Sequence, residues 1–134
     1  MDTAQNVDLS PAQRARGVEA LYATGHWLLI EERFKDAADL FRAMCMIAES
    51  DERAWLGLGA AHEGALHDEV AIEMYATGFT LTKAGRLAVA TARVLRRLGR
   101  DDEAERALED AAAVANETSD LELIGILAHE GGQQ

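Results

Sequence analysis

Residues 55–78 of the chain read WLGLGAAHEGALHDEVAIEMYATG, and the same spacing of large, small and aromatic residues occurs 34 residues earlier. The matched positions are Leu21 with Trp55, Gly25 with Gly59, Ala37 with Ala71, and Phe41 with Tyr75. A more degenerate third copy follows after a step of 33 residues, with Ala88, Ala92, Gly99, Ala104 and Leu108 in equivalent positions. Such a period predicts a tandem array of one small structural unit.

A repeat of this length, with this order of large, small and aromatic residues, is typical of the tetratricopeptide repeat (TPR), a pair of helices. We expect an N-terminal segment at residues 1–17, followed by repeats at 18–50, 51–83 and 84–116. Residues 117–134 should form a capping helix and a tail, because the last repeat needs a cover for its apolar face. The sequence therefore predicts an all-α TPR helical-hairpin solenoid.

Within each pair we call the first helix A and the second helix B. The expected helices are 18–31 and 34–48, 52–64 and 68–81, 86–98 and 102–116, with 120–129 as the cap. A helical start at Pro11 and a break near Gly17 are expected before the first repeat. Gly25 and Gly59 fall where helix A approaches helix B, and Ala37 has the same role on helix B, since larger side chains would separate the helices.

Composition excludes several classes of protein. Apolar residues make up 49% of the chain and aromatic residues only 5%, with many Ala and Leu, which are strong helix formers. A net charge of −11 disfavours nucleic acid and anionic membrane surfaces as partners. No signal peptide or membrane-spanning run is evident, and a lone Cys45 fits a reducing compartment. We expect a soluble cytoplasmic protein that does not insert into membranes.

Residues suited to catalysis or metal binding are present but scattered. The four histidines are His26, His62, His67 and His129, and no two of them have the spacing of a metal site with a second pair of ligands. The chain has no glycine-rich phosphate loop and no nucleophile elbow. We therefore expect no enzyme activity, no cofactor and no metal. Cys45, Met44 and Met46 are expected to pack in the core, with a dimer contact as the alternative for Met46.

In a TPR solenoid the A helices line the concave face, so their residues at helical spacing should form a groove. The candidate groove residues are Tyr22, His26, Leu29, Ile30, Leu56, Gly57, Ala60, Glu63, Arg86, Val89 and Arg93. Small Gly57 and Ala60 beside Leu56 should leave pockets for two or three apolar anchors of an extended peptide. Alternatively, Tyr22, Leu29 and Ile30 pack against the N-terminal helix.

An arginine cluster marks the third A helix. Its members are Arg86, Arg93, Arg96, Arg97 and Arg100. They could bind an acidic stretch of a partner, or pair with the acidic residues of the following helix, Asp101, Asp102, Glu103, Glu105, Glu109 and Asp110. We favour the internal pairing, because charge runs are usually solvated surface.

Three short sequence motifs are more specific than the general TPR pattern. They are Phe41-Arg42-Ala43-Met44-Cys45, Trp55-Leu56-Gly57-Leu58-Gly59-Ala60 and Tyr75-Ala76-Thr77-Gly78. In these motifs the chain resembles the class II chaperones of type III secretion systems, the SycD/LcrH-like TPR family, whose members protect hydrophobic translocator proteins. The resemblance extends from residue 20 to about residue 112.

The resemblance implies a cytoplasmic chaperone of a Gram-negative bacterium that binds an extended translocator segment in its concave groove. The N-terminal extension is shorter than is usual in that family, where it often contributes to dimer contacts, so a homodimer is one of the oligomeric states left open. An adaptor for heat-shock chaperone tails is disfavoured, because the slots of its carboxylate clamp hold Tyr22, His26 and Gly57 here. A TPR adaptor or assembly subunit of another protein complex remains the alternative function.

Overall fold

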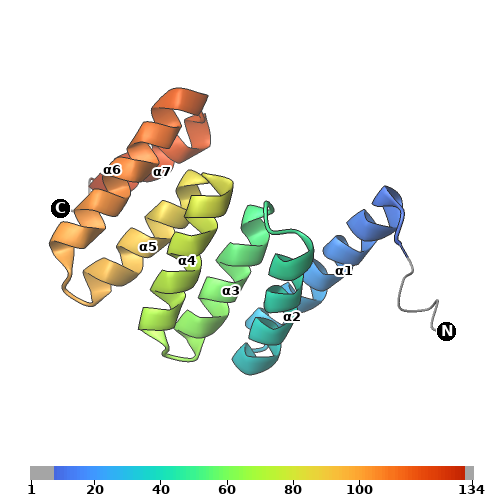
Figure 1. The fold of residues 1–134 in the computed structure, drawn as a ribbon. Helices are drawn as coiled ribbons and strands as arrows, with labels where there is room; N and C mark the ends of the chain where they lie inside the picture. Colours follow the sequence, from blue (N-terminus) through green and yellow to red (C-terminus); the bar gives the residue numbers. More distant parts are fainter. Residues whose placement is uncertain (1–7, 132–134) are drawn as a thin grey trace.

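The computed structural model describes residues 8–131, and over this range the protein is a curved stack of antiparallel helices (Figure 1). The helices are α1 (Pro11–Ile30), α2 (Phe34–Ile47), α3 (Glu52–Gly64), α4 (Asp68–Thr82), α5 (Gly85–Arg97), α6 (Asp101–Thr118) and α7 (Leu121–Gly131). No strand occurs among the described residues, so the all-α TPR prediction is confirmed. The ends of the expected N-terminal segment and tail, residues 1–7 and 132–134, lie outside the described range.

Helix α1 begins earlier than the predicted first A helix. Ser10 caps it: the Ser10 hydroxyl accepts from the Gln13 backbone N–H at 3.1 Å, and the Gln13 side chain accepts from the Ser10 N–H at 2.8 Å. Pro11 then occupies the first turn. The predicted break near Gly17 is wrong, since α1 runs unbroken through it. One glycine costs a helix only about 1 kcal/mol, which this capped start and the packing of α1 outweigh.

The helices form two layers. Each helix packs against the next in the chain, and in addition α1 touches α3, α3 touches α5, and α5 touches α7. No such contact joins α2 with α4, or α4 with α6, within the described part of the chain. A layer whose members touch lies on the inside of a curved stack, so α1, α3 and α5 line the concave face, as the TPR pattern predicts.

The repeated glycines make room for the repeated aromatic rings. The ring of Phe41, only 1% exposed, lies against both Gly25 of α1 and Gly57 of α3, and a Cβ at either glycine would meet it. The ring of Tyr75 covers Gly59 in the same manner. The expected alanines of the B helices, Ala37, Ala71 and Ala104, are fully buried. The large–small–aromatic pattern is therefore the packing pattern of the helix pairs.

Helix α7 closes the far end of the stack. Leu123 of α7 is 1% exposed and packs over Gly85, where an added Cβ would meet its side chain. Its core cluster also contains Val89 of α5 and Ala111 of α6. None of the helices within residues 8–131 combines the length and the apolar character needed to cross a membrane.

Candidate peptide-binding groove

The concave layer carries a pocket between α1 and α3, with a volume of about 180 Å³. It is lined by Tyr22, His26, Leu29, Phe41, Arg53, Leu56, Gly57 and Ala60. Six of the eleven predicted groove residues therefore come together: Tyr22, His26, Leu29, Leu56, Gly57 and Ala60. The walls of the pocket are mostly apolar, and the imidazole of His26 and the guanidinium of Arg53 add polar groups. Such a pocket suits an apolar side chain of a peptide, whose backbone is polar.

Tyr22 is held on three sides. Its ring stacks on His26 with centroids 5.9 Å apart, meets Phe41 edge-on at 6.4 Å, and lies 4.6 Å from the guanidinium carbon of Arg53. Aromatic pairs of this geometry, and a cation over a ring, favour this position of the ring. The side wall of the pocket is thus preformed.

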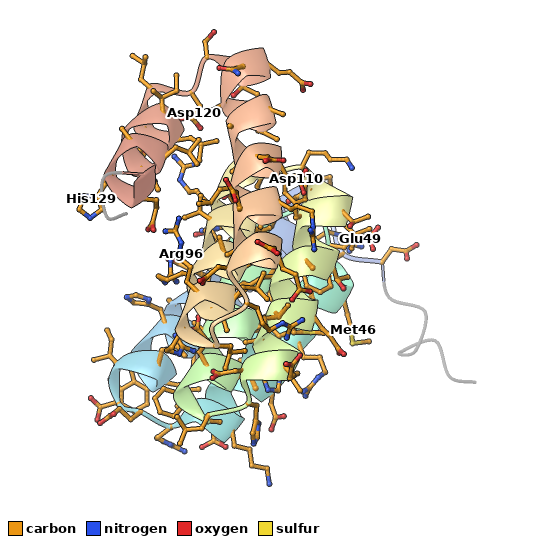
Figure 2. All side chains as sticks on the ribbon, turned by 90° about the vertical axis from the view of Figure 1, so that its left-hand side faces the viewer. Met46, Glu49, Arg96, Asp110, Asp120 and His129 are labelled. Carbon is orange, nitrogen blue, oxygen red and sulfur yellow. The ribbon has the colours of Figure 1, made fainter. Side chains whose placement is uncertain are left out.

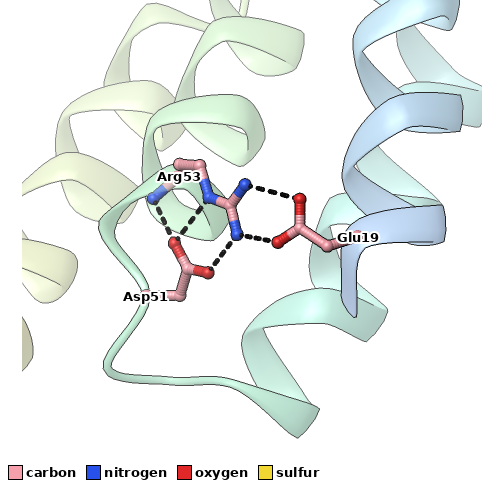
Figure 3. Close-up of polar contacts among 3 residues, drawn as sticks. All are labelled: Glu19, Asp51 and Arg53. Carbon is pink, nitrogen blue, oxygen red and sulfur yellow. Dashed lines mark hydrogen bonds and ion pairs between the residues drawn. The ribbon is translucent and has the colours of Figure 1, made fainter. Parts of the chain in front are cut away.

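Arg53 joins α1 to the start of α3 (Figure 3). It donates to Glu19 Oε2 at 2.6 Å and Oε1 at 3.1 Å, and to Asp51 at 2.8 and 3.1 Å. Asp51 also caps α3 by accepting from the Arg53 backbone N–H. These hydrogen bonds lower the pKa of both carboxyl groups. Glu19 is well exposed, so the pair contributes little stability, although it links the two helices that form the pocket.

Gly57 does not leave the open space that was predicted. The position above its Cα is already filled by the ring of Phe41 from α2. Room for an anchor therefore comes from Ala60 and from the gap between Tyr22 and Leu56. The pattern of small residues predicted the location of the pocket, but not that an aromatic ring of the B layer would form its floor.

Three of the other predicted groove residues lie elsewhere. Ile30 is 64% exposed at the end of α1 and does not line the pocket. Val89 is 4% exposed beneath α7, and Arg86 pairs with Asp120 and Glu122 at the start of that helix. Both corrections follow from α7, which packs beside α5: Leu123 of α7 shares a cluster with Val89, and Asp120 and Glu122 pair with Arg86.

The last two predicted residues, Glu63 and Arg93, lie at a polar end of the same face. Glu63 is three residues beyond Ala60 on α3, so it lies one turn from the pocket. It accepts from the Tyr75 hydroxyl at 2.5 Å and from Arg97 at 3.2 Å, and the Arg93 guanidinium is 3.9 Å away. Burial, and then the bond to Glu63, raise the pKa of Tyr75 above its usual value, so the hydroxyl stays protonated.

The arginine cluster pairs internally, but mostly with carboxylates other than the predicted ones. Only Glu103, which binds Arg100, belongs to the acidic run of α6. The remaining partners are Glu63 for Arg97 and Arg93, Asp68 for Arg97, Glu69 for Arg100, Asp120 and Glu122 for Arg86, and Glu130 for Arg96. They lie on α3, at the start of α4, and on or just before α7, so the cluster ties neighbouring repeats together. Figure 2 views this end of the molecule, with Arg96, Asp120 and His129 marked.

The sulfur-containing residues of α2 separate into core and surface. Met44 is fully buried and Cys45 is 7% exposed, as expected for core positions. Burial raises the pKa of the Cys45 thiol to about 12, which makes it a poor nucleophile. Met46 is 83% exposed, so its expected place in the core is wrong (Figure 2). Among residues 8–131 no three His, Cys, Asp or Glu side chains are arranged to hold a metal ion.

A second, larger apolar hollow was not predicted. It has a volume of about 390 Å³ and lies at the free edge of the first repeat, between the first half of α1 and α2. Leu9, Val18, Leu21, Leu40 and Ile47 are among its lining residues. Such an edge arises because no repeat precedes α1 and α2 among the described residues.

The fold is similar to those of known secretion chaperones. PcrH in complex with the chaperone binding region of PopB matches with a TM-score of 0.77 and 28% identity, over 94% of this chain and 98% of that chain. SycD, the type III secretion translocator chaperone of Yersinia enterocolitica, matches with a TM-score of 0.74 and 28% identity, over 84% of this chain and 86% of that chain. The TPR domain of Arabidopsis FLU, 18% identical with a TM-score of 0.65, shares the fold alone.

No family model and no curated protein sequence matches the chain. The structural matches nevertheless extend over most of its length, and the sequences of the matched chaperones are 28% identical to this one. These neighbours are chaperones rather than enzymes. They also belong to the group of chaperones whose sequence motifs resemble those around Phe41, Trp55 and Tyr75. In fold and in these residues, the chain is therefore similar to the class II translocator chaperones of type III secretion, the SycD/LcrH-like TPR proteins.

Proposed function

We propose that this protein is a cytoplasmic, non-catalytic chaperone that binds an extended segment of hydrophobic type III secretion translocators along α1, α3 and α5. It would keep these clients soluble and competent for secretion. PcrH has been crystallised with the chaperone binding regions of PopB and PopD, and SycD with a peptide of YopD, which supports a client of this kind. Proteins destined for membranes need such masking, because exposed apolar segments associate in water.

The observation that carries the proposal is the preformed apolar pocket between Tyr22 and Leu56 on the concave layer. Tyr22 is held by His26, Phe41 and Arg53, so little side-chain entropy is lost when a ligand binds. An extended chain advances about 3.3 Å per residue, so a few residues suffice to lie across neighbouring A helices. Affinity should come from a few anchored side chains in this pocket.

The test is co-expression with the hydrophobic translocators encoded beside the gene, followed by pull-down and measurement of the soluble client. Tyr22→Ala with Leu56→Ala should abolish the soluble complex, by weakening binding on the order of 100-fold. Ile30→Ala is the matched control: it shortens an exposed side chain outside the pocket and should leave the complex intact. Circular dichroism and thermal melting of each variant establish that it is folded.

A second variant keeps the test decisive if the double alanine variant unfolds. Ala60→Gln places a polar side chain in the pocket, from a position that is only partly buried. If a folded Ala60→Gln protein still solubilises the client, the pocket is not the binding site. If the wild-type protein leaves every neighbouring translocator insoluble, the chaperone proposal is wrong, and a TPR adaptor or assembly subunit becomes the better account.

Oligomeric state belongs to the same proposal. One SycD structure is described as an alternative dimer, so a homodimer is expected for this protein as well. Sedimentation of the protein with and without client would measure the stoichiometry directly. The exposed side chain of Met46 and the apolar edge hollow can then be examined by substitution.

A further inference from the structure

The arginines on and just after α5 differ in how fully they are engaged. Arg97 donates to Asp68 at 2.7 Å and to Glu63 at 3.2 Å, and Arg100 donates to Glu69 and Glu103, both at 2.6 Å. Arg86 and Arg96 each donate to a carboxylate on or just before α7. Arg93 alone among these five makes no hydrogen bond within residues 8–131, and its nearest carboxylate oxygen, on Glu63, is 3.9 Å away.

Glu63 does not hydrogen-bond to Arg93, because its Oε1 lies 3.9 Å from the Arg93 guanidinium. Its Oε1 already accepts from the buried Tyr75 hydroxyl at 2.5 Å, and its Oε2 accepts from Arg97. The side chain of Glu63 is 18% exposed, so it has little freedom to turn toward another donor. The guanidinium of Arg93, 53% exposed, therefore keeps its donors available while the nearby charge of Glu63 holds it in place.

Arg93 lies beside the path of a bound segment. It faces Glu63, which is about 4.5 Å along α3 from Ala60 of the pocket, given the helical rise of three residues. It belongs to α5, the next helix of the concave layer, and packed helices are separated by about 8–10 Å. About three residues of extended chain span that distance.

We propose that Arg93 binds an acidic side chain of the segment held in the groove, about three residues from the one whose apolar side chain enters the pocket. The inference rests on the proposed function and names the chemistry of its ligand. Guanidinium and carboxylate form paired, charge-assisted hydrogen bonds. In a chain of net charge −11 the average field repels acidic residues of a ligand, so a bound carboxylate needs a nearby cation with unoccupied donors, and Arg93 supplies one.

The test uses a displayed library of random 12-residue peptides, selected on the purified wild-type protein and on Arg93→Gln, Arg93→Glu and Arg106→Gln. Wild-type protein should select peptides with an apolar residue and Asp or Glu at a fixed spacing. Arg93→Gln should lose the acidic preference, and Arg93→Glu should favour Lys or Arg instead. Arg106 is an exposed arginine on α6, in the other layer, so Arg106→Gln removes the same charge and should select as the wild type does.

A binding cycle then measures the pair directly. For a selected peptide, Arg93→Gln should weaken binding about tenfold, and so should Asp→Asn in the peptide. Together they should weaken it little further, because each removes the same interaction. If wild-type protein selects apolar peptides without an acidic residue, or if Arg93→Gln keeps the preference, the inference is wrong although the groove still binds. If no peptide is selected whose binding depends on Tyr22 and Leu56, the proposed function itself fails.

Discussion

Single glycines decide how closely the two helical layers approach. Gly25 and Gly57 lie on opposite sides of the Phe41 ring, so one aromatic side chain occupies the volume that two missing side chains leave. Gly57 lies in the interior of α3, where glycine weakens a helix, so packing must favour it. Gly17 of α1, in contrast, has no atom near the position that a Cβ would occupy, so no packing contact requires a glycine there.

These two glycines should respond to the same substitution with opposite signs. Gly57→Ala should destabilise the protein by about 1–3 kcal/mol, because Phe41 is too buried to move away from the new methyl group. Gly17→Ala should stabilise it by up to about 1 kcal/mol, since helix propensity improves and nothing is displaced. Urea unfolding of both variants measures the two changes. Equal effects at both positions would contradict the packing role of Gly57.

At the scale of elements, one buried hydroxyl joins two helices. Tyr75 of α4 donates to Glu63 of α3, and its raised pKa leaves it protonated in the folded protein at pH values where an unfolded tyrosine ionises. Stability from this group is complete below the ordinary value of 10.0 and declines as the pH rises above it. At pH 11 the loss should be about 1.4 kcal/mol, corresponding to one unit of pH.

Tyr75→Phe isolates this contribution. At pH 7 the variant should be less stable by about 1.5–3 kcal/mol, the usual net value of a hydrogen bond to a charged group. Between pH 9 and 11 its stability should fall less steeply than that of the wild type, because the titrating hydroxyl is absent. Urea unfolding at each pH gives both curves, and parallel curves would show that Tyr75 ionises normally in the folded state.

Ion pairs between neighbouring A helices follow the repeat period. Four of them join residues 34 positions apart: Glu19 with Arg53, Glu63 with Arg97, Arg86 with Asp120, and Arg96 with Glu130. Opposite charges at equivalent positions of successive repeats were visible in the sequence, and they indicate which helices lie side by side. The prediction instead pairs the arginines with the acidic run that follows them in the chain, and it is wrong for most of them.

The sequence therefore predicted elements better than their assembly. Helix α3 begins and ends at the predicted residues, and α2 and α4 begin where expected, because turn residues and the period mark those ends. The pocket around Tyr22 and Leu56 followed from the A-helix rule. The burial of Val89 did not, because it depends on where α7 lies, which the large, small and aromatic residues of the three repeats do not indicate. The 34-residue spacing of Arg86 and Asp120 places α7 as the A helix of an unfinished fourth repeat.

At the scale of the whole molecule, α7 continues the concave layer beyond α5: Arg86 pairs with Asp120 just before α7, and Arg96 pairs with Glu130 near its end. Leu123 is the central apolar contact between α7 and α5, packed against Gly85 and the cluster around Val89. The concave face between Tyr22 and Arg93 has an apolar pocket at one end and an available cation at the other. A bound segment that reached Arg86 would have to compete with Asp120 and Glu122 for its guanidinium.

Loss of the α7 contact should therefore affect the two ends of the protein differently. Leu123→Ala should destabilise the protein by about 2–5 kcal/mol, since it removes a fully buried side chain. Hydrogen exchange should rise in α5, α6 and α7 and change little in α1 and α2, because repeats are stabilised mainly by their neighbours. Leu121→Ala, on the same helix but 82% exposed, is the matched control and should change neither measurement. Equal loss of protection in all seven helices would mean that the stack unfolds as one unit, and that α7 supports the Tyr22 pocket from the opposite end of the molecule.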